Sequence, residues 1–320
     1  MPVSPSNEGM VLVMGVTGAG KSYFVNKLKE GSTVEGATLT SCTSVCQIVE
    51  TYVGDTKVAV VDCPGFDDTK RSDTEILSVI SELVTAQYHM GMKLWGIVFL
   101  HRITDVRFQG STQNVLSLFQ QLVGDDALSN VVLVTTQWGR VTHVDMPDAI
   151  NREQQLRDEY WREMLDKNSM TRRFDDSRAS AEGIIALLIG RDNVVLRLQK
   201  ELVDEKKALG KTAAGLMLGP KVDKKLKASK DDVKRLRAEL QKKPNNTRRL
   251  RIQREILEAE ERIAKGESDE ARLGKKVGVD LIDKLKRVDW TQGLKIALSV
   301  LGFAVTIVSL VLGGGQGGAF

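Results

Sequence analysis

Apolar residues follow two different patterns along the chain. Up to about residue 192, short runs of consecutive apolar residues alternate with amphipathic stretches of helical spacing. The runs predict buried strands at 10–14, 94–100 and 130–136, and the amphipathic stretches predict helices at 22–28, 72–88, 112–123, 151–165 and 180–189. Strands that alternate with helices predict an α/β fold, with a mostly parallel sheet covered by helices on both faces.

Residues 10–192 are predicted to form one such domain. Two β-rich runs at 45–53 and 57–61 flank a Gly54-Asp55-Thr56 turn, which predicts an antiparallel hairpin within it. The stretch 31–43 is polar and rich in Gly, Thr and Ser, and predicts a loop. Residues 1–9 hold two prolines and two serines and predict a disordered lead-in.

Residues 193–290 are predicted to form a charged helical or coiled-coil extension, dense in Lys and Arg that alternate with acids from Lys200 to Lys286. Two apolar stripes at near-heptad spacing are interrupted by Lys243-Pro244-Asn245-Asn246-Thr247, which breaks the helix and supplies a cap. The stripes consist of Val222, Leu226, Val233, Leu236 and Leu240, then Ile252, Ile256, Ala259 and Ile263. They predict a helical hairpin or short coiled coil. Because each stripe spans only two to three heptads, helices without a partner are an equal alternative.

Residues 291–320 are apolar and uncharged after Lys295. Within them, 296–312 has only Ser and Thr as polar members, and with the following glycines it is long enough to cross a bilayer as a helix. Cations and a tryptophan precede it, as interfacial anchors do: Lys284, Lys286, Arg287, Trp290 and Lys295. We expect a C-terminal membrane anchor on the cytoplasmic face of an intracellular membrane. The alternative is a helix buried in the protein's own core.

Composition narrows the class of protein. The net charge of +4 is mild, and the Lys and Arg residues are interspersed with Asp and Glu, so no nucleic-acid partner is expected. Cys42, Cys46 and Cys63 lack a second Cys pair or a His cluster to complete a metal site, which favours reduced cytosolic thiols. The opening residues lack the apolar segment of a secretory signal.

The stretch from Gly15 to Ser22 carries the chemistry. It matches the phosphate-binding pattern G-x-x-x-x-G-K-[ST] and lies between a predicted strand and a predicted helix. Its backbone N–H groups form a nest for phosphate oxygens, Lys21 reaches the β- and γ-phosphates, and the Ser22 hydroxyl binds Mg²⁺. The predicted nucleotide-binding residues here are Gly15, Thr17, Gly18, Ala19, Gly20, Lys21, Ser22 and Tyr23.

A second nucleotide signature, Asp62-x-x-Gly65, follows the second strand of the hairpin. A carboxylate at this position holds Mg²⁺ through water, and the Gly65 N–H binds the γ-phosphate. Asp62 and Gly65 are therefore candidate nucleotide ligands, and Asp62 with Ser22 is a candidate metal site.

Together these motifs resemble the septin-like and GIMAP/Toc-type (AIG-type) branch of P-loop GTPases, particularly a group of fungal proteins. Further stretches extend the resemblance over about residues 10–190: Leu39 to Thr43, Asp62 to Phe66, Leu100 to Ile103, Arg107, Gly110 and Thr135 to Trp138. The resemblance implies a Ras-like sheet, GTP and GDP as ligands with Mg²⁺, and a switch that dimerises through this domain. It also implies that Thr43 closes on Mg²⁺ and the γ-phosphate, so that Lys21, Thr43 and Gly65 are the catalytic residues; a loop cap is the alternative role of Thr43.

The residues that read the base depart from the GTPase pattern [NT]-K-x-D. The chain has Thr136, Gln137, Trp138 and Gly139 there, so the guanine-reading Asp is missing. Asp145 follows in the same loop and is a possible substitute. Ser180 and Ala181 resemble the short signature behind the base, and with Thr136 and Gln137 complete the predicted nucleotide ligands. Base specificity stays open.

The hydrolytic residues also depart from the Ras pattern. Phe66 follows Gly65, where a Gln positions the attacking water in Ras-like enzymes. This predicts slow turnover or help from a dimer partner. His101 and Arg102 end a predicted strand and are weaker candidates for contact with the nucleotide, a structural role being favoured for both.

The sequence thus predicts a GTP-binding, slowly hydrolysing switch of the septin/GIMAP-like class, dimerising and membrane-anchored. Two alternatives stay open. One is a nucleotide-binding scaffold that does not hydrolyse, and the other is a nucleotide-controlled effector whose tail acts on membranes.

Overall fold

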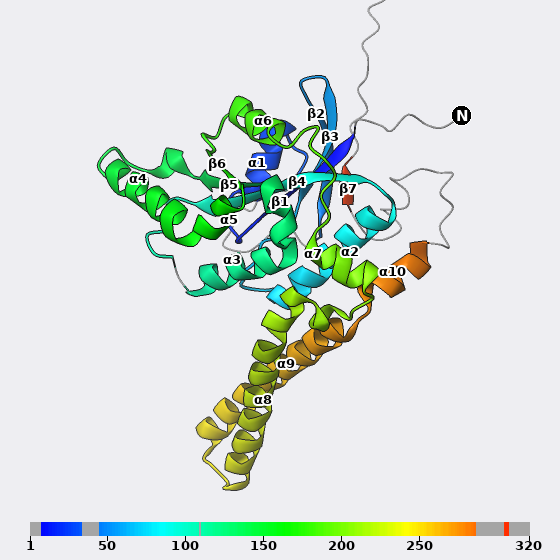
Figure 1. Cartoon of the computed structure of the whole chain (residues 1–320). Helices are drawn as coiled ribbons and strands as arrows, with labels where there is room; N and C mark the ends of the chain where they lie inside the picture. The colour runs from blue at the N-terminus through cyan, green and yellow to red at the C-terminus, as the bar shows by residue number, and fades with distance from the viewer. Residues whose placement is uncertain (1–7, 34–44, 109, 286–303, 307–320) are drawn as a thin grey trace, which may run out of the picture.

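The computed structural model of the chain describes residues 8–33, 45–108, 110–285 and 304–306 (Figure 1). Its centre is a sheet with the strand order β6-β5-β4-β1-β3-β2-β7. The strands are β1 (Gly9–Gly15), β2 (Gln47–Val53), β3 (Thr56–Asp62), β4 (Lys93–Arg102), β5 (Val131–Thr136), β6 (Met170–Arg173) and β7 (Ala304–Thr306). All neighbours are parallel except β2 and β3, the predicted antiparallel hairpin.

Helices cover both faces of this sheet, as the alternating pattern predicts. They are α1 (Lys21–Leu28), α2 (Asp73–His89), α3 (Gly110–Val123), α4 (Met146–Gln155), α5 (Arg162–Asp166), α6 (Arg178–Ala186) and the short α7 (Arg197–Gln199). α1 and α6 pack together on one face, and α2, α3 and α7 on the other (Figure 1). Every residue of β1 is buried, as in a central strand with both faces covered.

Two sequence predictions for this domain were wrong in detail. The helix expected at 151–165 begins earlier, at Met146, and is interrupted by a π-helical turn at Leu156–Tyr160 before α5. The polar stretch was too weakly periodic to show where the helix begins or where it is interrupted, whereas its predicted end agrees with that of α5 to within one residue. Strand β6 was missed because Met170–Arg173 is short, polar and at the sheet edge, so it lacks the apolar run that marks a buried strand.

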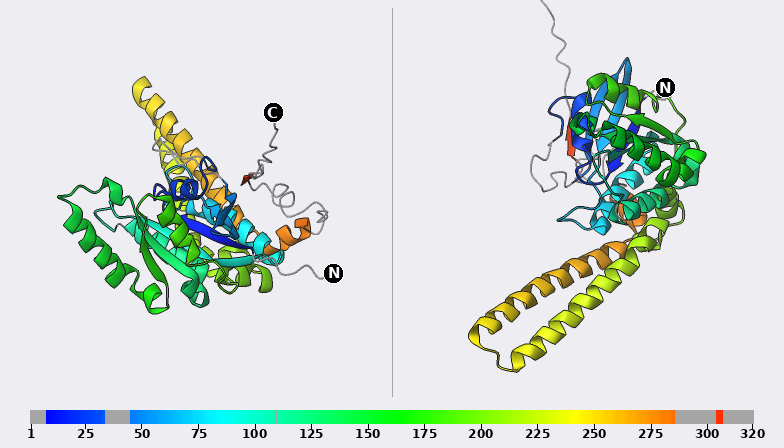
Figure 2. Two further views of the ribbon diagram at one scale, coloured as in Figure 1. Left: turned by 90° about the horizontal axis from the view of Figure 1, so that it is seen from above. Right: turned by 90° about the vertical axis from the view of Figure 1, so that its left-hand side faces the viewer.

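The predicted helical hairpin is present. α8 (Ala213–Gln241) and α9 (Asn246–Gly274) run antiparallel and project from the domain (Figure 2). Asn245 caps α9 by accepting a hydrogen bond from the Arg248 N–H at 2.9 Å. Farther out, Leu236, Ile252 and Ile256 form a small apolar cluster between the two helices. The apolar stripes of the two helices therefore pack against each other. After α9, the chain forms α10 (Val277–Leu285), which packs against α2.

The C-terminal apolar segment differs from its prediction where it is described. Ala304–Thr306, in the middle of the expected helix, form strand β7, which pairs with Gln47–Val49 of β2. The residues on either side, 286–303 and 307–320, lie outside the described part of the chain. Within the part that is described, no helix has the length and apolarity that crossing a bilayer requires.

Candidate functional site

The predicted phosphate loop connects the carboxyl end of β1 to α1, at the edge of a parallel sheet where ligands bind. Gly18 and Gly20 have φ values of +79° and +88°, which L side chains rarely adopt, and Gly20 is the N-cap of α1. A Cβ on Gly15 would lie 2.3 Å from the Leu100 carbonyl oxygen of the neighbouring strand. The glycines are thus needed for the turn and for its close approach to the sheet.

Lys21 begins α1 and turns back over the loop. Its Nζ donates a hydrogen bond to the Val16 carbonyl oxygen at 3.0 Å, and the residue is only 7% exposed. Burial lowers the pKa of Lys21 from its usual value, and the negative charge of Asp62 opposes that shift. The side chain is held in the loop, where an ammonium group can meet the phosphates of a nucleotide.

Ser22 and Asp62 meet as the two motifs predict. The Ser22 hydroxyl donates a hydrogen bond to the Asp62 carboxylate at 2.6 Å, although the two residues are forty positions apart. A hydroxyl and a carboxylate oxygen are ligands that Mg²⁺ accepts, directly or through water, so this donor set fits that ion. Thr43, the third predicted metal ligand, lies outside the described residues, as does most of the loop at 31–43.

The second motif lies directly against the first. The Thr17 N–H donates to the Phe66 carbonyl oxygen at 2.8 Å, and the Thr17 hydroxyl donates to that of Gly65 at 3.0 Å. A Cβ on Gly65 would come within 2.5 Å of Lys21 Nζ and 2.7 Å of the Thr17 Cα. Gly65 therefore lies next to Lys21, the lysine that is predicted to bind the phosphates.

Thr136 and Gln137 reach the phosphate loop from the end of β5. The buried Thr136 hydroxyl donates to the Ala19 carbonyl oxygen, and the Gln137 amide donates to that of Gly18, both at 2.9 Å. Gln137 has a φ of +65°, which directs the chain away from the strand. In this structure both side chains stabilise the phosphate loop by hydrogen bonds to its backbone.

A carboxylate from another loop lies beside the position where the predicted base-reading Asp is missing. Gly139 has no side chain, but an Asp176 carboxylate oxygen lies 3.1 Å from where a Cβ of residue 139 would be. Burial raises the pKa of Asp176 above its usual value, and the charge of Lys27 on α1 opposes that shift. Asp145 instead accepts a hydrogen bond from the Thr142 hydroxyl at 2.6 Å.

Sequence reasoning missed Asp176 as a candidate. It lies in the turn between β6 and α6, with a φ of +67°, just before Ser180 and Ala181. An Asp-Asp pair ahead of that short signature was the available signal. It had little weight because Asp is common in turns and β6 had not been predicted.

Ser180 and Ala181, predicted behind the base, and Tyr23, predicted beside the phosphate loop, have contacts within the protein. Ala181 is buried, and the Ser180 hydroxyl accepts a hydrogen bond from the Asp175 N–H at 3.3 Å. The Tyr23 ring packs edge-on against Phe174 and lies under the Lys27 ammonium, 4.7 Å from the ring centre.

His101 and Arg102 have different surroundings although they are adjacent. His101 is buried against Phe108 and Trp161, and burial lowers its pKa to about 4, so it is a neutral core residue at pH 7. Arg102 pairs with Asp105 at 3.0 Å, and its guanidinium lies 3.0 Å from where a Cβ of Gly18 would be. Arg102 is thus the cation beside the loop, and His101 has the structural role that the sequence favoured.

The AIG1 family model matches residues 9–172, which is half of the chain and includes both phosphate motifs. The chain belongs to the AIG1 family. The AIG-type resemblance seen in the motifs is therefore confirmed, and with it a P-loop GTPase fold.

Individual relatives are distant. "GTP-binding protein A" of Dictyostelium discoideum is 28% identical over 147 residues, and the match covers 46% of this chain but only 32% of that protein. Toc33 from Arabidopsis thaliana, solved with GDP and Mg²⁺, is 16% identical, with a TM-score of 0.49, over 59% of this chain and 88% of the other. Era, solved with MgGDPNP and ribosomal RNA, is 14% identical, with a TM-score of 0.41, over 62% and 66%.

Proposed function

We propose that this AIG1-family chain binds GTP with Mg²⁺ and hydrolyses it slowly, acting as a molecular switch. The observation that carries the proposal is the phosphate site, in which Lys21, Ser22, Asp62 and Gly65 meet around one loop. Lys21 and the backbone N–H groups of the loop bind the phosphates. Ser22 and Asp62 hold the ion, with Thr43 as the third predicted ligand, and Mg²⁺ supplies neutralisation of charge on the β- and γ-phosphates.

Asp176 supports guanine as the base. A carboxylate accepts hydrogen bonds from the N1–H and N2–H donors of guanine, and adenine offers no such pair of donors. The Asp176 oxygen lies next to Gly139, where the missing Asp would begin. We infer that Asp176 substitutes for it, from another loop.

The position after Gly65, where a Gln orients water in Ras-like enzymes, holds an apolar side chain. Phe66 follows Gly65 and is completely buried, so it cannot contact an attacking water. This supports slow intrinsic turnover. It also supports a second copy of the chain that supplies the group orienting the attacking water, as the family resemblance implies. Arg102 lies next to Gly18 at the rim of the loop, and this supports a role on the phosphate charge of its own copy or of the partner copy.

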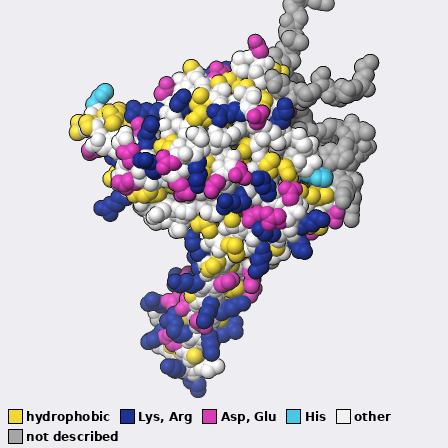
Figure 3. Space-filling view, in the orientation of Figure 1, with side chains coloured by type: hydrophobic (Ala, Val, Ile, Leu, Met, Phe, Trp, Pro, Cys, Tyr) yellow, Lys and Arg dark blue, Asp and Glu magenta, His cyan; other side chains and the backbone are white. Residues whose placement is uncertain are grey.

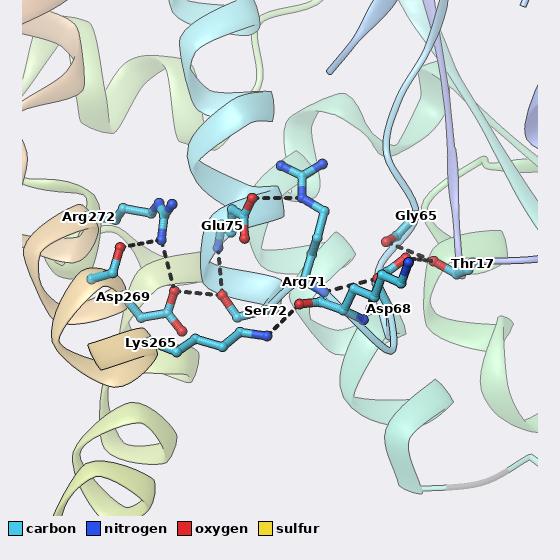
Figure 4. Close-up of polar contacts among 11 residues, drawn as sticks. Thr17, Gly65, Asp68, Arg71, Ser72, Glu75, Lys265, Asp269 and Arg272 are labelled. Carbon is cyan, nitrogen blue, oxygen red and sulfur yellow. Dashed lines mark hydrogen bonds and ion pairs between the residues drawn. The ribbon is translucent and has the colours of Figure 1, made fainter. Parts of the chain in front are cut away.

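A continuous set of contacts joins the phosphate site to the hairpin (Figure 4). Thr17 donates to Asp68 at 3.2 Å, and Asp68 accepts from the Lys70 and Arg71 N–H groups at 2.8 and 3.0 Å. In the same turn, Ser72 donates to Asp269 of α9 at 2.6 Å. We propose that a γ-phosphate at Gly65 shifts this segment and that α9 carries the change to a partner.

The tail supports a membrane location. Residues 291–320 are apolar after Lys295, and we propose that they anchor the protein to an intracellular membrane, with the nucleotide domain on its cytoplasmic face. Strand β7 belongs to this segment, so anchoring as a spanning helix requires β7 to leave β2.

The direct test is nucleotide binding to the full chain with Mg²⁺, comparing GTP, xanthosine triphosphate and ATP. GTP binding lost in Lys21→Ala is the expected result. Asp176→Asn should weaken GTP binding by about 1–3 kcal/mol and improve xanthosine binding, because an amide can donate to the extra carbonyl of xanthine. Asp145→Asn is the matched control and should change neither. Equal binding of ATP and GTP, or a loss confined to Asp145→Asn, would contradict the assignment of Asp176.

A non-hydrolysing scaffold is the second candidate, favoured by the burial of Phe66. Phosphate release at high protein concentration, where a dimer forms, separates the two. A GTPase releases phosphate with a rate per molecule that rises with concentration, and a scaffold releases none.

A further inference from the structure

Positive charge is concentrated at one end of the helical hairpin. The distal part, residues 234–254, holds nine Lys and Arg residues and a single acid, Glu239. The proximal parts, 213–233 and 255–274, together hold eight basic and ten acidic residues. Figure 3 shows Lys and Arg side chains gathered around the end of the hairpin that is farthest from the sheet. The hairpin therefore has a cationic tip, defined as residues 234–254, on a nearly neutral stem.

Much of the charge at this cationic tip is not used within the protein. Arg235, Arg237, Arg248 and Arg251 pair with acids. The other five cations are exposed and make no ion pair with any residue that the structure describes: Lys234, Lys242, Lys243, Arg249 and Arg254. Five unpaired cations within about three helical turns of a loop form a site for a surface of many negative charges.

Two exposed leucines accompany these cations. Leu250 and Leu257 are 64% and 62% exposed, and with Arg254 they follow the i, i+4, i+7 spacing of one helix face. That face is opposite the one carrying Ile252 and Ile256, which pack against α8. Apolar and basic side chains together on an exposed helix face are typical of helices that lie at a lipid interface.

The side chains around the cationic tip argue against nucleic acid as its binding partner. Phosphate charge alone would suit the cations, but bases are bound by stacking on aromatic side chains, and residues 213–274 contain no Phe, Tyr or Trp. A phosphodiester backbone also offers nothing apolar for Leu250 and Leu257. A bilayer provides both anionic headgroups and hydrocarbon just beneath them.

We propose that the cationic tip of the α8–α9 hairpin docks on the surface of an anionic lipid bilayer, with Leu250 and Leu257 inserted among the headgroups. This contact is separate from the proposed tail anchor and does not depend on it. Because the stem joins the tip to the phosphate site through Ser72 and Asp269, the two ends of the hairpin link nucleotide and membrane.

The test is co-sedimentation of the full chain with vesicles of phosphatidylcholine alone or mixed with phosphatidylserine. The tip variant replaces Lys242, Lys243, Arg249 and Arg254 by Gln. The control replaces Lys221, Lys224, Lys225 and Lys227 of the stem, which are exposed and likewise make no ion pair with a described residue. Both variants lose four charges, so net charge is matched. A tail anchor would bind both kinds of vesicle equally. If the proposed tail anchor does not exist, the difference between vesicles with and without phosphatidylserine should remain.

We expect phosphatidylserine to increase the binding of the unchanged chain to vesicles, and this increase to depend strongly on salt. The tip variant should bind phosphatidylserine vesicles at least about tenfold more weakly than the unchanged chain, and the control variant should bind them as the unchanged chain does. Leu250→Ser with Leu257→Ser should weaken binding with little change in the salt dependence. Equal losses in tip and stem variants, or no effect of phosphatidylserine, would overturn the proposal. So would an RNA oligonucleotide that binds more tightly than the anionic vesicles at the same salt and depends on the tip.

Discussion

Single residues of the phosphate site are constrained by distances that allow little substitution. A Cβ on Gly65 would lie 2.5 Å from Lys21 Nζ and 2.7 Å from the Thr17 Cα, both parts of the loop. The lysine end can move, but the backbone of Thr17 is fixed by its hydrogen bond to Phe66. A methyl group at Gly65 must therefore displace the loop.

We expect Gly65→Ala to abolish measurable GTP binding, since the displaced loop no longer forms its nest for phosphate. Gly183→Ala is the matched control: the same methyl group in α6 meets no atom within 4 Å and should leave binding unchanged. Isothermal calorimetry of both variants checks this. Near-normal affinity in Gly65→Ala would show that the phosphate loop does not lie where we place it.

His101 makes the stability of the domain sensitive to acid. Burial lowers its pKa to about 4, against about 6.5 in the unfolded chain, so between these values only the unfolded state takes up the proton. Stability is fully present above about pH 6.5 and falls as the pH drops toward 4. From pH 7 to pH 5 this residue alone should cost about 2 kcal/mol.

His101→Gln should remove that part of the pH dependence. Urea unfolding at pH 7 and pH 5 measures it, and the quantity compared is the change in unfolding free energy between the two pH values. The exposed His143 is the matched control. His143→Gln should lose as much unfolding free energy between pH 7 and pH 5 as the unchanged protein does. If His101→Gln also lost this much unfolding free energy, the imidazole of His101 would not be the buried neutral group described.

At the scale of elements, α9 and α2 are joined by a polar contact that the apolar pattern does not contain. Ser72 caps α2 by accepting from the Glu75 N–H at 3.1 Å, and it donates to Asp269, which is only 6% exposed. Arg272 lies 3.4 Å from the same carboxylate. The start of α2 and the stem of the hairpin therefore share one hydrogen-bond network.

We expect a double-mutant cycle of Ser72→Ala and Asp269→Asn to give a coupling energy of about 1 kcal/mol in urea unfolding. The control cycle pairs Asp269→Asn with Ser177→Ala, the cap of α6, which does not contact α9, and should give a value near zero. Equal coupling in both cycles, or none in either, would mean that the contact does not join the hairpin to the start of α2.

At the scale of the whole molecule, strand β7 and the proposed membrane-spanning helix are mutually exclusive arrangements of the tail. As β7 it supplies backbone partners to β2 at the sheet edge, and as a spanning helix it would satisfy its hydrogen bonds within itself. The proposed anchoring therefore costs the pairing at β2, which the burial of the apolar tail in lipid must offset.

Removing residues 291–320 should abolish sedimentation with pure phosphatidylcholine vesicles, where the cationic tip has no anionic partner. The truncated chain should still bind phosphatidylserine vesicles through the tip. Sedimentation assays of both chains with both vesicles provide the measurement and its internal control. A truncated chain that still pellets with phosphatidylcholine would rule out the tail as the anchor.

Much of this organisation follows from the sequence itself, because it depends on neighbouring residues. The loop from Gly15 to Ser22 is set by glycine conformations between a strand and a helix, and the end of α8 by Pro244 and the cap Asn245. Stripes such as Ile252 and Ile256 show which helix face is buried. These features are local, so consecutive residues determine them.

Other features appear only when distant segments meet. Asp176 stands beside Gly139 because β6 and α6 fold next to the end of β5, and Asp269 meets Ser72 across 197 positions of chain. Pairing of Ala304–Thr306 with β2 depends on an open sheet edge, which no local pattern reveals. Positions of this kind are decided by how the sheet orders its strands and where the helices pack, so only the tertiary structure determined them.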